Sequence, residues 1–199
     1  MRQDQFARAE EELSRMLDAE QRLRRSRDEA SSRQAWQDLL NHSQRMYNFL
    51  TAALKGSAAE RTWSRDRQDE RKSDPLLQYV QQARHADEHG LQLVVEPHST
   101  AYIMPDRAGS ARIRRVAVMN DGTIIVDGED HLGNPLDPLE IVALNFVRIV
   151  PVVNRGVTYP VPSAHLGSVI EHNNIAMLAR HITRHTEGVI SGAKQFLVS

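Results

Sequence analysis

The sequence predicts an α+β protein in which a helical N-terminal half is followed by short strands and a final helical segment. Residues 1–90 hold one proline and a single glycine before Gly90, whereas residues 91–162 hold the other seven prolines and are rich in Val and Ile. Apolar residues at helical spacing dominate the first part, and short β-branched runs between turn residues dominate the second. We therefore expect a helical bundle over residues 1–90, a small antiparallel β lobe over 91–162, and a C-terminal helical segment over 163–199 that packs back on the bundle.

Three helices are predicted in the first 90 residues. Residues 32–55 have a wide apolar face that ends at Gly56, and Asp74-Pro75 is a start signal for a helix over 75–89, with Gly90 as its C′ residue. Residues 57–74 are polar and are predicted as a loop or a loose helix. The first helix is indicated by an amphipathic stripe of Phe6, Leu13, Met16, Leu17 and Leu23.

Short strands are predicted after Gly90. Asn120-Asp121-Gly122 and Asn154-Arg155-Gly156 are hairpin signals between apolar runs. Prolines near the second hairpin indicate edge strands or bulges. We expect five or six strands in one antiparallel sheet, followed by helix over 163–196, which Asn173-Asn174 can divide.

Composition excludes several classes of protein. There is no cysteine, so disulfides, thiolate zinc sites, iron–sulfur clusters and cysteine nucleophiles are excluded. The net charge of −1 excludes a globally basic nucleic-acid coat protein. No apolar run is long enough to span a membrane and the charged start does not resemble a signal peptide, so we expect a cytoplasmic protein with no membrane partner. Phosphate-loop, dinucleotide-binding and nucleophile-elbow motifs are absent from the sequence, and we expect no cofactor.

One segment carries a set of residues suited to chemistry. Residues 84–89 read Arg-His-Ala-Asp-Glu-His. Because successive helical residues turn by about 100°, Arg84, Glu88, His85 and His89 form one polar arc at the end of the predicted helix. Arg84 and Asp87 also fall within the apolar arc of this helix, where charges are costly unless they are paired or line a groove. Histidines, an arginine and carboxylates at one helix terminus are a candidate acid–base and anion-binding set.

This segment resembles the R-x-x-x-x-H motif of HEPN domains, in which the residue after the arginine is typically Asn, Asp or His. The helical N-terminal half also fits that superfamily, and the resemblance covers about residues 30–90. The strings D-P-L-L-Q-Y, A-R-H-A-D-E-H-G and N-R-G-V-T-Y-P-V-P are in addition similar to an uncharacterised bacterial protein family. Arg180 and His185 repeat the same spacing of arginine and histidine.

The resemblance implies a function and a site. Many HEPN proteins are metal-independent ribonucleases, some of them toxin-like or defence-related, that act as homodimers on single-stranded RNA. By analogy, His89 would act as the general acid–base, Arg84 would stabilise the charge on the phosphoryl oxygens, and His85 would position the phosphate. Glu88 completes the candidate catalytic set. No metal is expected for this chemistry.

Two alternatives remain open. Glu88 lies four residues after Arg84, so the pair can be an ordinary helical ion pair in a non-catalytic HEPN-like module that binds a protein partner or a ligand. Alternatively, the two H-x-x-x-H pairs, His85 with His89 and His181 with His185, could face each other and hold zinc, with a carboxylate of residue 87 or 88 as a further ligand.

Overall fold

The computed structural model describes residues 2–26, 28–88, 94–102, 112–118, 124–129, 142–170 and 174–197. It confirms the α+β class, with helices dominant and the strands short. The chain divides into two compact units, one made of residues 1–98 and 145–199 and the other of residues 99–144. The amino-acid composition changes near residues 90 and 162, whereas the boundaries between the two compact units lie at residues 98 and 145. Residues 145–162, including the second predicted hairpin, therefore belong to the same unit as the helices.

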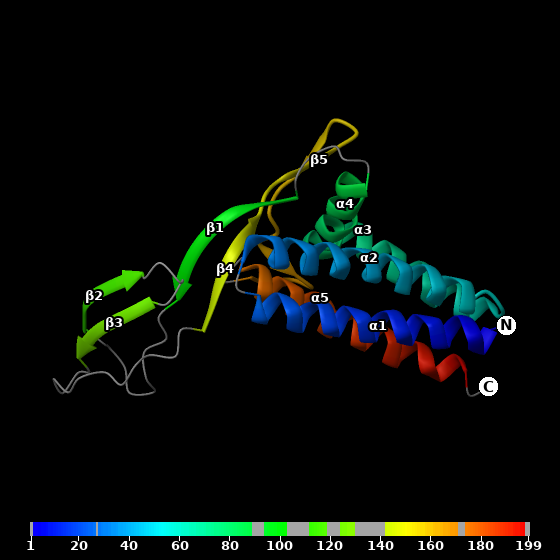
Figure 1. The fold of residues 1–199 in the computed structure, drawn as a ribbon. Helices are drawn as coiled ribbons and strands as arrows, with labels where there is room; N and C mark the ends of the chain where they lie inside the picture. The colour runs from blue at the N-terminus through cyan, green and yellow to red at the C-terminus, as the bar shows by residue number, and fades with distance from the viewer. Residues whose placement is uncertain are drawn as a thin grey trace. The chain divides into compact units, whose positions relative to one another are not determined.

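The larger unit is built on helices. Figure 1 shows α1 and α2 as an antiparallel pair, with α5 along α1 and both chain termini at the same end of the bundle. The C-terminal helix thus packs back on the N-terminal helices. The helices of the described residues are α1 (Arg2–Arg25), α2 (Glu29–Ala53), α3 (Ala58–Ser73), α4 (Pro75–Glu88) and α5 (Ile175–Ala193), followed by the 3-10 helix η1 (Lys194–Phe196).

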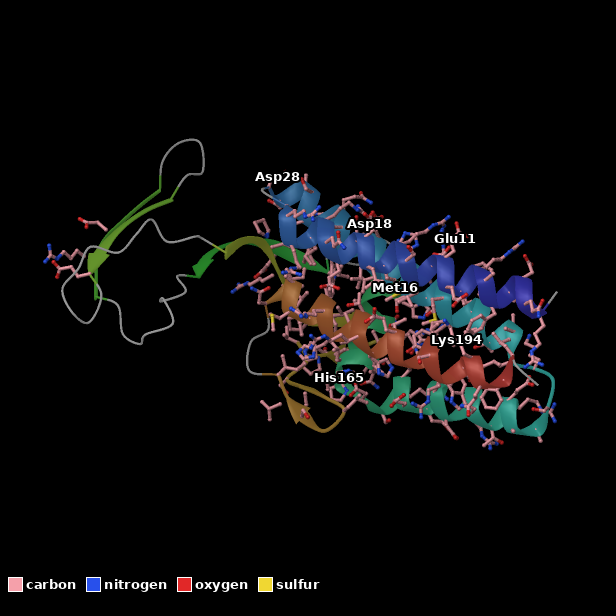
Figure 2. The ribbon with its side chains drawn as sticks, turned by 90° about the horizontal axis from the view of Figure 1, so that it is seen from below. Glu11, Met16, Asp18, Asp28, His165 and Lys194 are labelled. Carbon is pink, nitrogen blue, oxygen red and sulfur yellow. The ribbon has the colours of Figure 1, made fainter. Side chains whose placement is uncertain are left out.

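The apolar stripes predicted from the sequence form the core. Figure 2 shows Met16 on the inner side of α1, with Glu11 and Asp18 on the opposite side. Removing such side chains from water is the main force that holds the helices together. The largest fully buried side chains come from all these helices except α3 and include Met16, Trp36, Leu39, Leu40, Met46, Leu76, Tyr79, Ile175, Leu178 and Ile182.

Buried polar side chains connect helices that are distant in the sequence. Thr183 Oγ1 on α5 donates a hydrogen bond to Glu20 Oε2 on α1 at 2.7 Å. The imidazole of His42 on α2 lies 2.6 Å, Nδ1 to Oε2, from the carboxylate of Glu12 on α1. Buried polar groups cost free energy unless they are hydrogen-bonded, so these pairs favour one arrangement of the helices.

Residues 58–73 form the regular helix α3, although the sequence left open a loop. The helix has no wide apolar face, which is why its signal was weak. Its start is fixed locally instead: Ser57 caps it by accepting from the Glu60 N–H at 3.2 Å, and Glu60 Oε2 accepts from the Gly56 N–H at 2.9 Å. Two orphan N–H groups are satisfied in this way.

The strands of the described residues form four two-stranded ladders and not one sheet. The pairs are β1 with β4, β2 with β3, β5 with β6, and β7 with β8; prolines at 151, 160 and 162 interrupt the later strands, which keeps them short. The strands are β1 (Val95–Tyr102), β2 (Arg112–Val118), β3 (Ile124–Glu129), β4 (Val142–Ile149), β5 (Val152–Asn154), β6 (Val157–Tyr159), β7 (Ala164–His165) and β8 (Ser168–Val169).

Both predicted hairpins pair as expected. In the smaller unit β2 and β3 are antiparallel, and the predicted turn at 120–122 lies outside the described residues, as does Gly90. In the larger unit Asn154 pairs with Val157, so Arg155 and Gly156 alone make the turn. Their φ angles of 51° and 78° are both positive, as a type I′ turn requires.

Residues 164–169 form a hairpin, which corrects the prediction of helix from residue 163 onward. His165 pairs with Ser168, and Leu166 and Gly167 make the turn with φ angles of 48° and 78°. Two-residue strands are too short to show an alternating pattern. Helix α5 begins at Ile175, and the Asn174 side chain caps it by accepting from the backbone N–H groups of Ala176 and Met177.

Helix α4 contacts both β5 and β7. Its middle is tied to the strand region by Tyr79, whose hydroxyl donates to the Val150 carbonyl at 2.8 Å. Among the described residues, no helix is long and apolar enough to cross a membrane.

Candidate functional site

The structure places part of the predicted motif at the end of α4. Arg84 and His85 are both half-buried on its last turns. Glu88 is the last helical residue, and its side chain lies outside the described part of the chain, as does His89. The spatial relation of Arg84 to His89 therefore stays a prediction.

The buried face of α4 agrees with the sequence pattern. Leu76, Val80 and Ala83 are buried in the core. Asp87, which the pattern placed near this face, accepts a hydrogen bond from Gln37 Nε2 on α2 at 2.9 Å. The hydrogen bond compensates for placing the carboxylate near the buried face, and it connects the end of α4 to α2.

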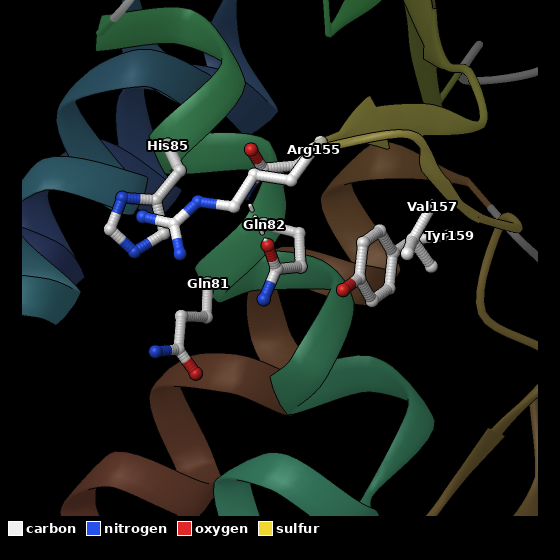
Figure 3. Close-up of a pocket in the computed structure, with 7 residues that line it drawn as sticks. Gln81, Gln82, His85, Arg155, Val157 and Tyr159 are labelled. Carbon is white, nitrogen blue, oxygen red and sulfur yellow. Dashed lines mark hydrogen bonds between the residues drawn. The ribbon is translucent and has the colours of Figure 1, made fainter.

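A polar pocket of about 380 Å³ opens between α4 and the β5–β6 hairpin. Its volume lies within the range of small-ligand sites. In Figure 3 the Arg155 side chain extends from the turn of the hairpin over α4 in the direction of His85. The lining residues are Gln81, Gln82 and His85 from α4, and Asn154, Arg155, Val157 and Tyr159 from the hairpin.

The lining of this pocket offers groups that suit a nucleotide. Asn154 Nδ2 donates to Gln82 Oε1 at 2.6 Å, and each amide keeps further donor or acceptor capacity. The guanidinium of Arg155 and the imidazole of His85 can contact phosphate oxygens, and the ring of Tyr159 can stack on a base. Sequence reasoning found His85 but missed the other residues, since they follow from the packing of the hairpin on α4.

The basic residues of α3, which could have supplied a positive field, are largely engaged elsewhere. Arg71 is buried, with Nη2 donating to Gln44 Oε1 at 2.9 Å and its guanidinium carbon 3.9 Å from the centre of the Tyr47 ring. Lys72 forms an ion pair with Asp69 at 3.0 Å. Burial lowers the pKa of Arg71, partly opposed by Tyr47, and raises the pKa of the Tyr47 phenol to about 12.

A second polar cluster, which the sequence did not predict, lies at the other end of α4. Asp74, at the corner between α3 and α4, caps α4 by accepting from the Leu77 N–H at 2.9 Å. The same carboxylate accepts from His165 Nδ1 at 3.0 Å and from the Leu166 N–H at 2.6 Å. Burial alone would raise the pKa of Asp74, but these hydrogen bonds outweigh burial and hold it below its usual value. Asp74 is therefore an anion that joins the β7–β8 hairpin to the start of α4.

Two histidines of α5 complete this cluster. The ring centres of His181 and His185 lie 6.0 and 5.4 Å from that of His165, each in an edge-to-face arrangement. The His185 side chain is only 5 % exposed, and its Nε2 lies 3.9 Å from Glu70 Oε2. Burial, reinforced by the neighbouring His165, lowers the pKa of His181 and lowers that of His185 to about 4. Both rings are therefore neutral at pH 7.

The zinc alternative gains no support from this geometry. His181 and His185 contact His165, and their predicted partner His89 lies outside the described residues. Within the described ranges, no group of three or more His, Cys, Asp or Glu side chains is arranged to hold a metal ion.

Comparison with protein-family models, with curated proteins and with solved structures found no match to this chain. The function therefore has to be argued from the chain's own residues.

Proposed function

We propose that this protein is a HEPN-like, metal-independent endoribonuclease that binds single-stranded RNA along the last turns of α4. The observation that supports this most directly is the pocket beside the motif. His85, the residue next to Arg84, lines a polar pocket together with Arg155 and Tyr159. A pocket whose lining suits phosphate and base thus adjoins His85, one of the residues that the motif assigns to chemistry.

The proposed reaction is transesterification within the RNA. A phosphate held near Arg84 and His85 is attacked by the neighbouring ribose 2′-oxygen, whose proton passes to a base on the protein. His89 accepts this proton as the general base, and as imidazolium it donates a proton to the leaving 5′-oxygen. The P–O5′ bond breaks as the P–O2′ bond forms, which gives a 2′,3′-cyclic phosphate and a 5′-hydroxyl. Arg84 stabilises the charge that grows on the phosphoryl oxygens.

The experiment is cleavage of labelled single-stranded RNA in excess EDTA. We expect cutting by the native protein, with cyclic phosphate ends, and a loss of roughly 100-fold or more in both Arg84→Ala and His89→Ala. Arg180→Ala is the matched control, since Arg180 is exposed and begins the second Arg-x-x-x-x-His string. Cutting that EDTA abolishes, or that persists in both motif variants, would contradict the proposal.

A second candidate, a non-catalytic RNA-binding module, is favoured by one observation: Arg155 and Tyr159, which suit a phosphate and a base, belong to the β5–β6 hairpin and not to the α4 motif. Binding and cutting can therefore be separated. Arg155→Asn removes the guanidinium but keeps a residue that tolerates the positive φ of 51° at this position. We expect this variant to bind RNA about tenfold more weakly, the loss typical of one charge-assisted hydrogen bond. RNA binding without cutting would establish the module; neither binding nor cutting would reject both candidates.

The proposal includes a homodimer in which two copies of α4 face one RNA. Sedimentation equilibrium tests it directly, because the single chain has a mass of 22.5 kDa. We expect twice that mass at micromolar concentration. An active monomer would overturn this part of the proposal while leaving the cleavage chemistry in place.

A further inference from the structure

The β7–β8 hairpin is attached to the helices through a small number of groups that respond to protons. Its described hydrogen bonds to the α3–α4 corner both end on the Asp74 carboxylate: one comes from His165 Nδ1 and the other from the Leu166 N–H. The hairpin also closes on itself, with the Ile170 N–H donating to the Ser163 carbonyl. The described hydrogen bonds between the hairpin and this corner therefore depend on one buried anion, and one of them also depends on an imidazole.

The two histidines of α5 that contact that imidazole lie where additional positive charge is disfavoured. His165 and His185 are almost fully buried and their ring centres are 5.4 Å apart, while His181 approaches the same ring from one turn earlier on α5. The facing groups on α3 are Glu70, Arg67 and Arg71. Of these, Glu70 is already ion-paired with Arg67 at 2.9 Å. On α5 itself, Arg180 and Arg184 act on His181 and further lower its pKa.

These positions determine the direction of the pH response. A histidine whose folded pKa is depressed binds a proton more readily once it leaves the buried site. Acidification therefore favours the released state from the ordinary histidine pKa of about 6.5 down to the folded value, which is about 4 for His185. Asp74 remains ionised through this range, because its pKa lies below that of an ordinary aspartate.

We propose that His181 and His185, which pack against His165, make its attachment to Asp74 a proton-operated latch that holds the β7–β8 hairpin on the start of α4 at neutral pH and releases it in mild acid. The latch goes beyond the proposed RNA cleavage and does not depend on it. Release of the hairpin can affect the pocket beside α4, because only residues 160–163 separate β7 from Tyr159, the pocket residue at the end of β6.

The test is hydrogen exchange of single amides in the full chain between pH 7 and pH 4.5, corrected for intrinsic exchange rates. The Leu166 amide reports release of the hairpin, and the Met16 amide in the buried stripe of α1 reports global unfolding. Each histidine that takes up a proton when the hairpin opens raises the equilibrium constant for opening by about tenfold for every unit by which the pH falls. We expect such a rise for Leu166 at pH values where Met16 stays protected.

Variants assign the response to the cluster. His181→Gln and His185→Gln remove one titrating group each, and in both variants the opening constant for Leu166 is expected to rise less steeply as the pH falls than in the native protein. For His185→Gln the rise is expected to be smaller by about tenfold per pH unit. His42→Gln is the matched control, since His42 is also half-buried and paired with a carboxylate, but on α2; its slope should equal the native one.

Three results would overturn the latch: a flat pH response of Leu166, equal opening constants for Leu166 and Met16 at every pH, or native slopes in both glutamine variants. If a glutamine variant fails to fold, the native protein decides the question by NMR titration of its histidines. Ring signals of His181 and His185 with pKa values near 6.5, unconnected to the Leu166 amide, would then reject the proposal.

Discussion

Asp74 links three parts of the chain through one carboxylate, which makes its contribution to stability measurable. Replacing it with alanine removes the cap of α4, worth about 1 kcal/mol, and leaves the two donors from the hairpin without their acceptor, each costing about 1–3 kcal/mol when buried. We expect Asp74→Ala to lower the free energy of unfolding by at least about 3 kcal/mol in urea denaturation at pH 7.5.

Ser57→Ala is the matched control for that prediction. Ser57 also caps a helix, but the hydroxyl accepts only from the Glu60 N–H. Its loss should cost about 1 kcal/mol, which is the cap alone. Equal losses in Asp74→Ala and Ser57→Ala would mean that the bonds to the hairpin contribute nothing, and would remove the anchor on which the latch depends.

The residues of the two candidate sites were predictable to different degrees. The polar arc at the end of α4 follows from helical spacing alone, and so does the role of Asp74 as a helix cap. The partner of Asp74, His165, lies 91 residues further along the chain. No local pattern reports a contact at that separation, because it depends on how a short hairpin packs. For the same reason Arg155 and Tyr159 could not be assigned to the pocket beside His85.

At the scale of elements, a glycine within α5 allows the helix propensity of one position to be measured in the folded protein. Gly188 lies on its exposed side, and a Cβ added there meets nothing within 4 Å. Glycine within a helix costs about 0.5–1 kcal/mol relative to alanine, mainly through backbone entropy. Gly188→Ala should therefore raise the free energy of unfolding by about that amount, measured in urea.

Gly192 provides the comparison on the same helix. A Cβ there would lie 3.6 Å from Trp63 Cζ2, an ordinary van der Waals contact. Gly192→Ala is expected to stabilise at least as much as Gly188→Ala, because the methyl group adds contact with the indole. A lower free energy of unfolding for Gly188→Ala would show that the stability of α5 at this position depends on something other than backbone entropy.

Helices with a clear apolar periodicity in their own sequence were predicted well. Elements whose structure depends on packing against other parts of the chain were not. Helices α1, α2 and α4 carry apolar stripes, so their extents follow from periodicity to within a few residues. Helix α3 has a polar sequence, and its one clear signal, Ser57 followed by Glu60, is a capping pattern. The β7–β8 hairpin has strands of two residues each, below the length at which alternation can be recognised.

At the scale of the whole molecule, the helical unit is expected to be the cooperative unit of folding. The buried apolar residues from Phe6 to Ala193 form one core cluster within residues 1–98 and 145–199. Residues 99–144 are a separate compact unit. Its two ends leave and re-enter the larger unit on β1 and β4, which are hydrogen-bonded neighbours, so a short connection can replace it.

We therefore expect a variant in which a short Gly-Ser turn replaces residues 99–144 to keep the helix content of the larger unit and to unfold in one cooperative transition. Shortening this connection to a turn of about five residues lowers the entropic cost of loop closure by about 2 kcal/mol, so the midpoint in urea should not fall. Removal of residues 175–197 is the opposing control, because Leu178 and Ile182 are fully buried and Thr183 bonds to Glu20; that variant should lose cooperative unfolding. If instead the first variant unfolds without cooperativity, then residues 99–144 supply contacts that the helical core requires, and the two units fold as one.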